Sequence, residues 1–192
     1  MPALSSAGLN VILQTMHTKR RVYLAPLEDK HISHYLKLSD DPELVATEGW
    51  RPFGIDEKER FLQTLQVLTL PYCDSGETII FSITSAADDK AIGYVSIKGI
   101  NEAEFSAELG IGIMEKEYRS QGYGTEALKL ALDYAFNELG LALLGLTVFP
   151  SNERAIRAYE KVGFKRKEVL EKSWLMPDGK CADMLLMEVT QD

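Results

Sequence analysis

The sequence of 192 residues predicts one α/β (α+β) domain, in which a central mixed and mostly antiparallel sheet is flanked by helices in the order βααβββαβαββ. Three observations predict this class. The length is typical of one domain, and 45% apolar with 26% charged residues is the composition of a globular protein. Strand-like and helical patterns also alternate along the chain without an internal repeat. We assign residues 21–190 to the domain and residues 1–20 to a flexible N-terminal extension.

The first half of the domain is predicted as a strand, two helices and three further strands. The run RVYLAPL at 21–27 is strand-like, and apolar residues recur at helical spacing in the segment 28–44. A second helix is predicted over 56–69, before Pro71 interrupts its pattern. The runs ETIIFSIT, AIGYVSIKGI and EFSAELGIGIM follow closely and are separated by turn-forming residues, which predicts an antiparallel meander.

The second half begins with the most regular helix of the sequence. Its apolar stripe runs over 124–139 and ends at Gly140, a residue typical of a helix C-terminus. The apolar run LALLGLTVF at 141–149 is typical of a buried strand. Asn152 can cap a helix that reaches Val162, and two final strands flank a turn formed by Pro-Asp-Gly.

Charge and cysteine usage narrow the classes of partner. The net charge of −8 opposes binding to nucleic acid and favours cationic partners. The longest apolar stretch, 139–149, is too short to cross a bilayer, so no membrane association is expected. Cys73 and Cys181 form no CxxC motif and the histidines lack metal-ligand spacing, which predicts no metal site and a reducing, cytoplasmic setting.

The segment EYRSQGYGTEA at 117–127 carries the sharpest chemical signal, because it places two glycines between a strand and the start of a helix. Backbone N–H groups at a helix N-terminus can bind a pyrophosphate, and Arg119 adds a bidentate positive charge. The simpler alternative is a tight turn that only caps the helix.

A dinucleotide-binding site is a second alternative, because Gly122-x-Gly124-x-x-Ala127 fits its relaxed fingerprint. Two observations oppose a nucleotide-dependent oxidoreductase. Eight residues separate Ile113 at the strand end from the first glycine, and the next strand, 142–149, has no acidic residue for a ribose.

Two motifs in order resemble the GNAT superfamily of N-acetyltransferases, in particular its branch that acetylates ribosomal-protein N-termini and polyamines. Arg119-x-x-Gly122-x-Gly124 is similar to the acetyl-CoA pyrophosphate loop of that superfamily. Asn152-x-x-Ala155-x-x-Ala158-Tyr159-x-x-x-Gly163-Phe164 is similar to its second signature. The resemblance covers residues 21–190 and implies a GNAT-like domain.

The resemblance implies an acetyl-CoA site between two splayed strands. The strand that ends at Ile113 and Met114 would hold the acetyl-pantetheine arm, with one backbone N–H stabilising the oxyanion. Asn152 would bond the pantetheine amides, with helix capping as its structural alternative. The pyrophosphate loop would comprise Arg119, Gln121, Gly122, Tyr123, Gly124 and Thr125.

Two catalytic groups are expected, and the resemblance implies the first of them. Tyr159 would protonate the departing thiolate, although it could instead be a packed aromatic residue. Glu108 is our first choice of general base, because strand alternation places it beside Gly110 and Gly112; a cross-strand ion pair is the alternative. Glu48 and Glu77 are the fallback bases.

The implied activity is acetyl-CoA-dependent transfer of an acetyl group directly to a primary amine: a protein N-terminal α-amine, a polyamine or another small amine. The segment 41–53 resembles the acceptor-side loop of the branch, although Trp50 favours packing. A homodimer is a candidate assembly. The alternative from another class is a non-catalytic acetyl-CoA-binding sensor of the same fold.

Overall fold

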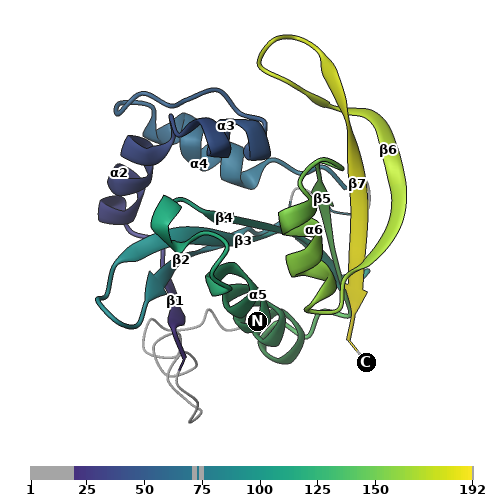
Figure 1. Cartoon of the computed structure of the whole chain (residues 1–192). Coiled ribbons are helices and arrows are strands. Elements are labelled where there is room, and N and C mark those ends of the chain that lie inside the picture. Colours follow the sequence, from purple (N-terminus) through teal and green to yellow (C-terminus); the bar gives the residue numbers. More distant parts are fainter. Residues whose placement is uncertain (1–19, 71–72, 74–75, 192) are drawn as a thin grey trace.

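The computed structural model describes residues 20–70, 73 and 76–191 (Figure 1). Nearly all of the predicted extension, residues 1–19, lies outside the described residues. Within the described residues, no helix combines the length and the apolarity that crossing a bilayer requires.

One mixed sheet forms the centre of the molecule, and its described strands lie in the order β1-β2-β3-β4-β5-β7-β6. All neighbouring strands pair antiparallel except β4 and β5, which pair parallel. This confirms the mixed, mostly antiparallel sheet and the predicted meander. The strands are β1 (Val22–Pro26), β2 (Ile79–Ser85), β3 (Ala91–Asn101), β4 (Ser106–Ile113), β5 (Leu143–Val148), β6 (Lys165–Leu175) and β7 (Cys181–Thr190).

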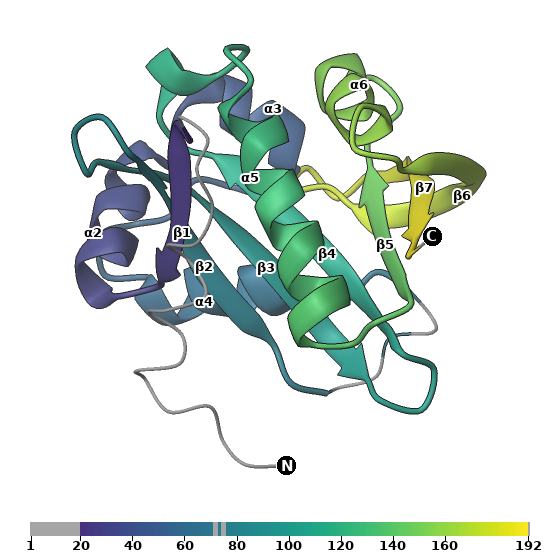
Figure 2. The same cartoon turned by 90° about the horizontal axis from the view of Figure 1, so that it is seen from below.

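Helices cover both faces of this sheet (Figures 1 and 2). One face carries α2 (Asp29–Leu38), α3 (Pro42–Glu48) and α4 (Lys58–Gln66). The other face carries α5 (Tyr123–Asp133), its π-helical extension η2 (Tyr134–Glu138) and α6 (Glu153–Glu160). A short 3₁₀ turn, η1 (Lys116–Tyr118), precedes α5.

The single helix predicted over 28–44 is wrong, because the structure has two helices there and the order is βαααβββαβαββ. Pro42 lacks a backbone N–H and begins α3 instead of continuing α2. The Asp41 carboxylate caps the new helix by accepting hydrogen bonds from the N–H groups of Glu43 at 3.0 Å and Leu44 at 3.2 Å.

The second predicted helix is shorter than expected, because α4 ends at Gln66. The following residues are held by other partners. The N–H groups of Thr69 and Leu70 donate to the Glu108 carboxylate at 2.6 and 3.0 Å, and the Leu70 side chain packs against Leu186.

Two hydrophobic clusters hold the layers together. The larger lies between the sheet and α5, where Leu128, Ala131 and Ala135 are buried as the predicted stripe requires. The smaller lies under α2, α3 and α4, where Trp50 contacts the Phe53 and Phe61 rings. The packing interpretation of Trp50 is therefore confirmed.

Candidate active site

A cleft opens where β4 and β5 separate. The two strands pair only from Ser106–Glu108 to Leu143–Gly145, and beyond these residues they diverge (Figure 2). A cavity of about 520 Å³ occupies this region, and side chains from both faces of the sheet line it. Parallel strands that separate leave backbone groups free to pair with a bound ligand.

The loop between β4 and α5 forms one end of this cavity. Its backbone turns through the left-handed region at Ser120, where φ is 62°, and at Gly122, where φ is 87°. Gly122 is the N-cap residue of α5, so the first N–H groups of that helix have no partners within it. Ser120, Gly122, Gly124 and Thr125 line the cavity. The loop therefore presents a helix N-terminus to the cleft, as predicted for anion binding.

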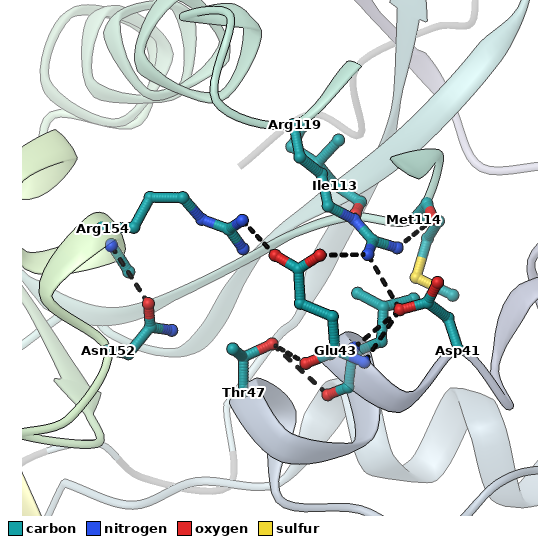
Figure 3. Close-up of polar contacts among 10 residues, drawn as sticks. Asp41, Glu43, Thr47, Ile113, Met114, Arg119, Asn152 and Arg154 are labelled. Carbon is teal, nitrogen blue, oxygen red and sulfur yellow. Dashed lines mark hydrogen bonds and ion pairs between the residues drawn. The ribbon is translucent and has the colours of Figure 1, made fainter. Parts of the chain in front are cut away.

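Arg119 joins the loop to α3 (Figure 3). Its guanidinium donates to the carbonyl oxygens of Ile113 at 2.9 Å and Met114 at 2.6 Å. It also pairs with Asp41 at 2.9 Å and Glu43 at 3.2 Å, and its side chain is only 4% exposed. Because four hydrogen bonds already occupy the guanidinium, this geometry favours a supporting role over the direct pyrophosphate contact that we predicted.

Glu43 continues this network across the cleft to α6. Its second carboxylate oxygen forms an ion pair with Arg154, which lies two residues after Asn152 (Figure 3). One carboxylate on α3 thus holds two arginines from opposite sides of the cleft. The network fixes the position of α3 relative to the loop and α6.

Arg21, which the sequence analysis missed, precedes β1 and supports the same loop. Its Nη1 donates to the Gln121 carbonyl at 2.8 Å, and its Nε pairs with Glu126 at 3.2 Å. The guanidinium also lies 4.8 Å from the centre of the Tyr123 ring. Gln121 and Tyr123 themselves lie outside the cavity lining: the Gln121 amide donates to the Glu117 carbonyl, and the Tyr123 ring lies against Arg21.

Asn152 caps α6 at the opposite side of the cleft. Its Oδ1 accepts a hydrogen bond from the Ala155 N–H at 3.2 Å. The side chain also lines the cavity. The helix cap uses the carbonyl oxygen, so the NH₂ group of the amide is left to donate to a ligand.

Glu108 is buried inside a polar cluster. Its carboxylate pairs with Lys98 on β3 at 2.8 Å and accepts hydrogen bonds from Thr69 Oγ1 at 2.8 Å and from two backbone N–H groups. The cross-strand ion pair, which was our structural alternative, is therefore present. A carboxylate that already holds four donors is poorly placed to accept a further proton.

The space that we expected beside Glu108 is filled from the neighbouring strand. Strand alternation places Glu108, Gly110 and Gly112 on one face, as predicted, opposite Lys98, Ser96 and Tyr94. A Cβ at Gly112 would lie 2.8 Å from the Tyr94 ring, and one at Gly110 would lie 2.7 Å from the Ser96 hydroxyl. The glycines thus admit the side chains of β3.

Glu48, the fallback base, lies at the end of α3 and lines the cavity. Burial raises the pKa of its carboxyl to about 7, although a hydrogen bond from the Tyr94 hydroxyl at 3.2 Å and the charges of Arg119, Lys98 and Arg154 oppose the rise. A carboxylate with this pKa can exchange a proton near neutral pH. Glu77, the other fallback base, is exposed and lies outside the cavity lining.

Tyr159 lies on α6 and lines the cavity, as its predicted role requires. Its ring packs against Phe164, with the ring centres 5.8 Å apart, so the packing role is also present. Burial and the nearby Glu48 charge raise the pKa of its hydroxyl above the usual value. Among the described residues the hydroxyl has no hydrogen-bond partner, and it is therefore available to a ligand.

Aromatic residues complete the cavity on the side of α3. Trp174 of β6 donates its indole N–H to the Gly49 carbonyl at 3.1 Å, and the register of β6 against β7 shifts between Leu170 and Trp174. Gly49 has a φ of 66°, and a Cβ there would lie 2.6 Å from both Phe149 and Trp174.

Some of the residues missed by sequence reasoning carried a usable signal. Tyr94 and Lys98 could have been found by pairing the predicted meander strands, because alternation aligns them with Gly112 and Glu108. Trp174 gave no such signal, since the register of β6 shifts before it and simple alternation cannot be followed across the shift. Within residues 20–70, 73 and 76–191, no three metal-ligating side chains come together.

Comparison with known proteins places this geometry among acetyltransferases. Residues 21–165 match the family model described as acetyltransferase (GNAT) domain. The sequence is 30% identical over 149 residues to spermidine N(1)-acetyltransferase of Escherichia coli K12, a match that covers 78% of this chain and 75% of that protein. The match to the Bacillus subtilis protein YjcK is 33% identical over 100 residues and covers 52% of this chain but only 55% of that protein.

Solved structures share the fold. The crystal structure of spermidine N-acetyltransferase from Vibrio cholerae in complex with CoA and spermine superposes with a TM-score of 0.72 at 24% identity, and the match covers 89% of this chain and 96% of that chain. A GNAT-family acetyltransferase from Bacillus anthracis gives a TM-score of 0.72 at 18% identity, with 88% and 95% of the two chains covered.

Proposed function

This chain belongs to the GNAT acetyltransferase family, and from that membership we propose how its acetyl-CoA-dependent N-acetyltransferase reaction is carried out. We propose that acetyl-CoA and a small amine bind together in the cleft between β4 and β5. The observation that carries this proposal is one continuous cavity lined by a helix N-terminus, by the Tyr159 hydroxyl and by the Glu48 carboxyl. No covalent intermediate on the enzyme is required.

The residues present fit acetyl-CoA. The N-terminus of α5 offers free N–H groups to the pyrophosphate, and Gly124 leaves space there, since a Cβ would have its nearest contact 3.5 Å away at Ile113. The unpaired part of β4 and the Asn152 amide suit the pantetheine amides. When bound, acetyl-CoA supplies an acetyl thioester that a neutral amine can attack.

We propose that Glu48 is the general base, in preference to Glu108. The acceptor amine arrives protonated at neutral pH and must lose a proton before it can attack. Glu48 has a pKa of about 7 and one hydrogen-bond donor, Tyr94, whereas Glu108 already binds Lys98 and Thr69. The Tyr159 hydroxyl holds the proton that the leaving sulfur needs.

The acceptor class is supported by the relatives and by charge. The Escherichia coli relative is named for spermidine, a polyamine, and the net charge of −8 attracts cationic amines. We therefore propose a small amine as the acceptor. Self-association is also proposed, because a spermidine N-acetyltransferase from Vibrio cholerae that shares this fold has a dodecameric structure.

The function is tested by binding and turnover together. Acetyl-CoA at a hundredfold excess over its Kd should stabilise the protein by about 2.7 kcal/mol, which raises Tm by roughly 5–10 °C for a chain of this size. Thiol release with a panel of amines should then show turnover, with the product identified by mass. A Tm shift by NADH alone would overturn the assignment, and binding without turnover on any amine would support the sensor.

Substitution of Gly124 separates ligand binding from helix capping. Gly124→Ala should not lower Tm, because a Cβ meets only Ile113 at 3.5 Å and alanine favours the helix. Gly124→Val should weaken acetyl-CoA binding at least about tenfold, because a branched side chain occupies the space over the helix N-terminus. A thermal melt measures Tm, and calorimetric titration measures the affinity for acetyl-CoA. Unchanged affinity in a folded Gly124→Val variant would mean that the loop only caps α5.

A further inference from the structure

The charges that line the cavity are unbalanced in a way that bears on the choice of acceptor. Among the described lining residues only Glu48 and Glu108 are acidic, whereas the cationic side chains are those of Lys98, Arg119, Arg154, Arg157 and Lys161. We call the part lined by Glu48, Trp50, Tyr94, Lys98, Glu108 and Trp174 the acceptor half. It lies on the α3 side of the sheet, away from the α5 N-terminus.

Glu108 is unavailable to a cationic ligand because Lys98 already neutralises it. The Lys98 Nζ donates hydrogen bonds to Glu108 Oε1 at 2.8 Å and to the Val67 carbonyl oxygen at 2.5 Å. The Lys98 side chain is 10% exposed and that of Glu108 is 3% exposed. A buried pair of this kind is held firmly, since removing either partner would leave an uncompensated charge.

One carboxylate therefore remains for the substrate. Glu48 can receive one ammonium group, and the rest of the acceptor half offers the rings of Trp50, Tyr94 and Trp174. A second ammonium in this space would lack a counter-charge, because Lys98 already occupies the Glu108 carboxylate. Burying an unpaired charge is costly, so such a ligand is disfavoured.

We propose that Lys98 is a specificity-determining residue, and that the enzyme prefers an acceptor with one amine on an uncharged, apolar stem over a diamine or polyamine. This inference rests on the proposed function, since it names the substrate class of the same site. It places Lys98 where the second ammonium of a diamine would otherwise pair with Glu108.

The test compares acceptors that differ in one charge. Values of kcat/KM are measured for hexylamine, for 1,6-diaminohexane and for a short uncharged peptide with a free apolar N-terminal residue, all with acetyl-CoA at pH 8. We expect the kcat/KM for hexylamine, for the peptide or for both to exceed that for the diamine by about tenfold or more. The two monoamine arms show whether the stem is an alkyl chain or an N-terminal residue.

Variants of Lys98 then test its role. Lys98→Met should lower the monoamine-to-diamine ratio by about tenfold, because Glu108 becomes available to the second ammonium. Lys98→Arg, the matched control, should keep the wild-type ratio. The double variant Lys98→Met with Glu108→Gln should lose the gain in diamine activity. Circular dichroism and Tm establish which variants fold.

Two results would overturn the inference. One is a wild-type enzyme that acetylates the diamine as well as or better than every monoamine, as expected if aromatic faces alone hold the second ammonium. The other is an unchanged ratio in a folded Lys98→Met variant. If Lys98→Met does not fold, the wild-type ratio alone decides. Absence of turnover with every amine would instead contradict the proposed function.

Discussion

Replacing Glu48 by glutamine should lower kcat/KM for the amine acceptor by about 10²- to 10³-fold at pH 8, the range that a positioned general base contributes. Acetyl-CoA affinity should be retained, because the carboxyl lies at the end of α3 and not at the α5 N-terminus. Glutamine keeps the size of the side chain and can still accept the hydrogen bond from Tyr94. Only the ability to take a proton is lost.

The pH dependence gives this variant a signature. Burial raises the pKa of Glu48 to about 7, so the carboxylate is a competent base above that pH and is protonated below it. Wild-type kcat/KM should therefore fall as pH drops through about 7. The deprotonation of the acceptor amine affects both enzymes equally, so the ratio of wild type to Glu48→Gln isolates the titration of Glu48.

The contribution of Glu48 to folding stability should fall as pH rises, whereas its contribution to activity should increase. Because the folded-state pKa is raised, protonation of Glu48 stabilises the fold, fully below the unfolded value of 4.5 and progressively less as pH rises through about 7. Glutamine does not ionise, so the Tm of Glu48→Gln relative to wild type should rise between these two pH values. A difference in Tm that stays constant between these two pH values would contradict a raised pKa at Glu48.

Glu108→Gln is the matched control, since it removes the other carboxylate of the same cavity. Its loss leaves Lys98 buried without a counter-charge, so we expect the free energy of unfolding to fall by about 3–5 kcal/mol. In Glu108→Gln, kcat/KM should still fall as pH drops through about 7, as in the wild type. If this fall in kcat/KM is absent in Glu108→Gln and present in Glu48→Gln, Glu108 is the base, as the sequence first predicted.

Replacing Tyr159 by phenylalanine should lower kcat by about 10²-fold when chemistry limits the rate, with folding and acetyl-CoA binding unchanged. The ring keeps its contact with Phe164, and the hydroxyl that is removed has no hydrogen-bond partner among the described residues. The effect should be moderate, because burial and the Glu48 charge raise the pKa of the hydroxyl and weaken it as an acid.

The leaving group offers an independent check on Tyr159. An acyl donor with a more acidic thiol needs less protonation as the bond breaks, so the difference between wild type and Tyr159→Phe should shrink for that donor. Single-turnover rates with both donors measure this. Equal rates for variant and wild type with acetyl-CoA would show that Tyr159 serves only in packing.

Most of the fold could be predicted from the sequence because its signals are local. Three such signals depend only on neighbouring residues in the chain: the apolar stripe of α5, the Asn152 cap and the glycines at the start of α5. One exception, the break between α2 and α3, also had a local signal in Asp41 and Pro42, which the longer helical spacing obscured.

The roles of charged side chains could not be predicted in the same way, because their partners are distant in sequence. Arg119 fits a phosphate-binding motif, but its guanidinium pairs with Asp41, which is 78 residues away. Glu43 and Arg154, separated by 111 residues, meet across the cleft. A motif specifies which residue type is present and leaves its partners open.

Two motifs in order were enough to indicate the family, and residue type and spacing were enough to predict the order of most elements and the glycine-rich loop at the start of α5. Three-dimensional packing was needed to distinguish the two glutamates as candidate bases. Strand register places Lys98 against Glu108 and neutralises it, whereas packing around the end of α3 buries Glu48 and raises its pKa to about 7. Desolvation and ion pairing act through space, so they are settled when the chain folds.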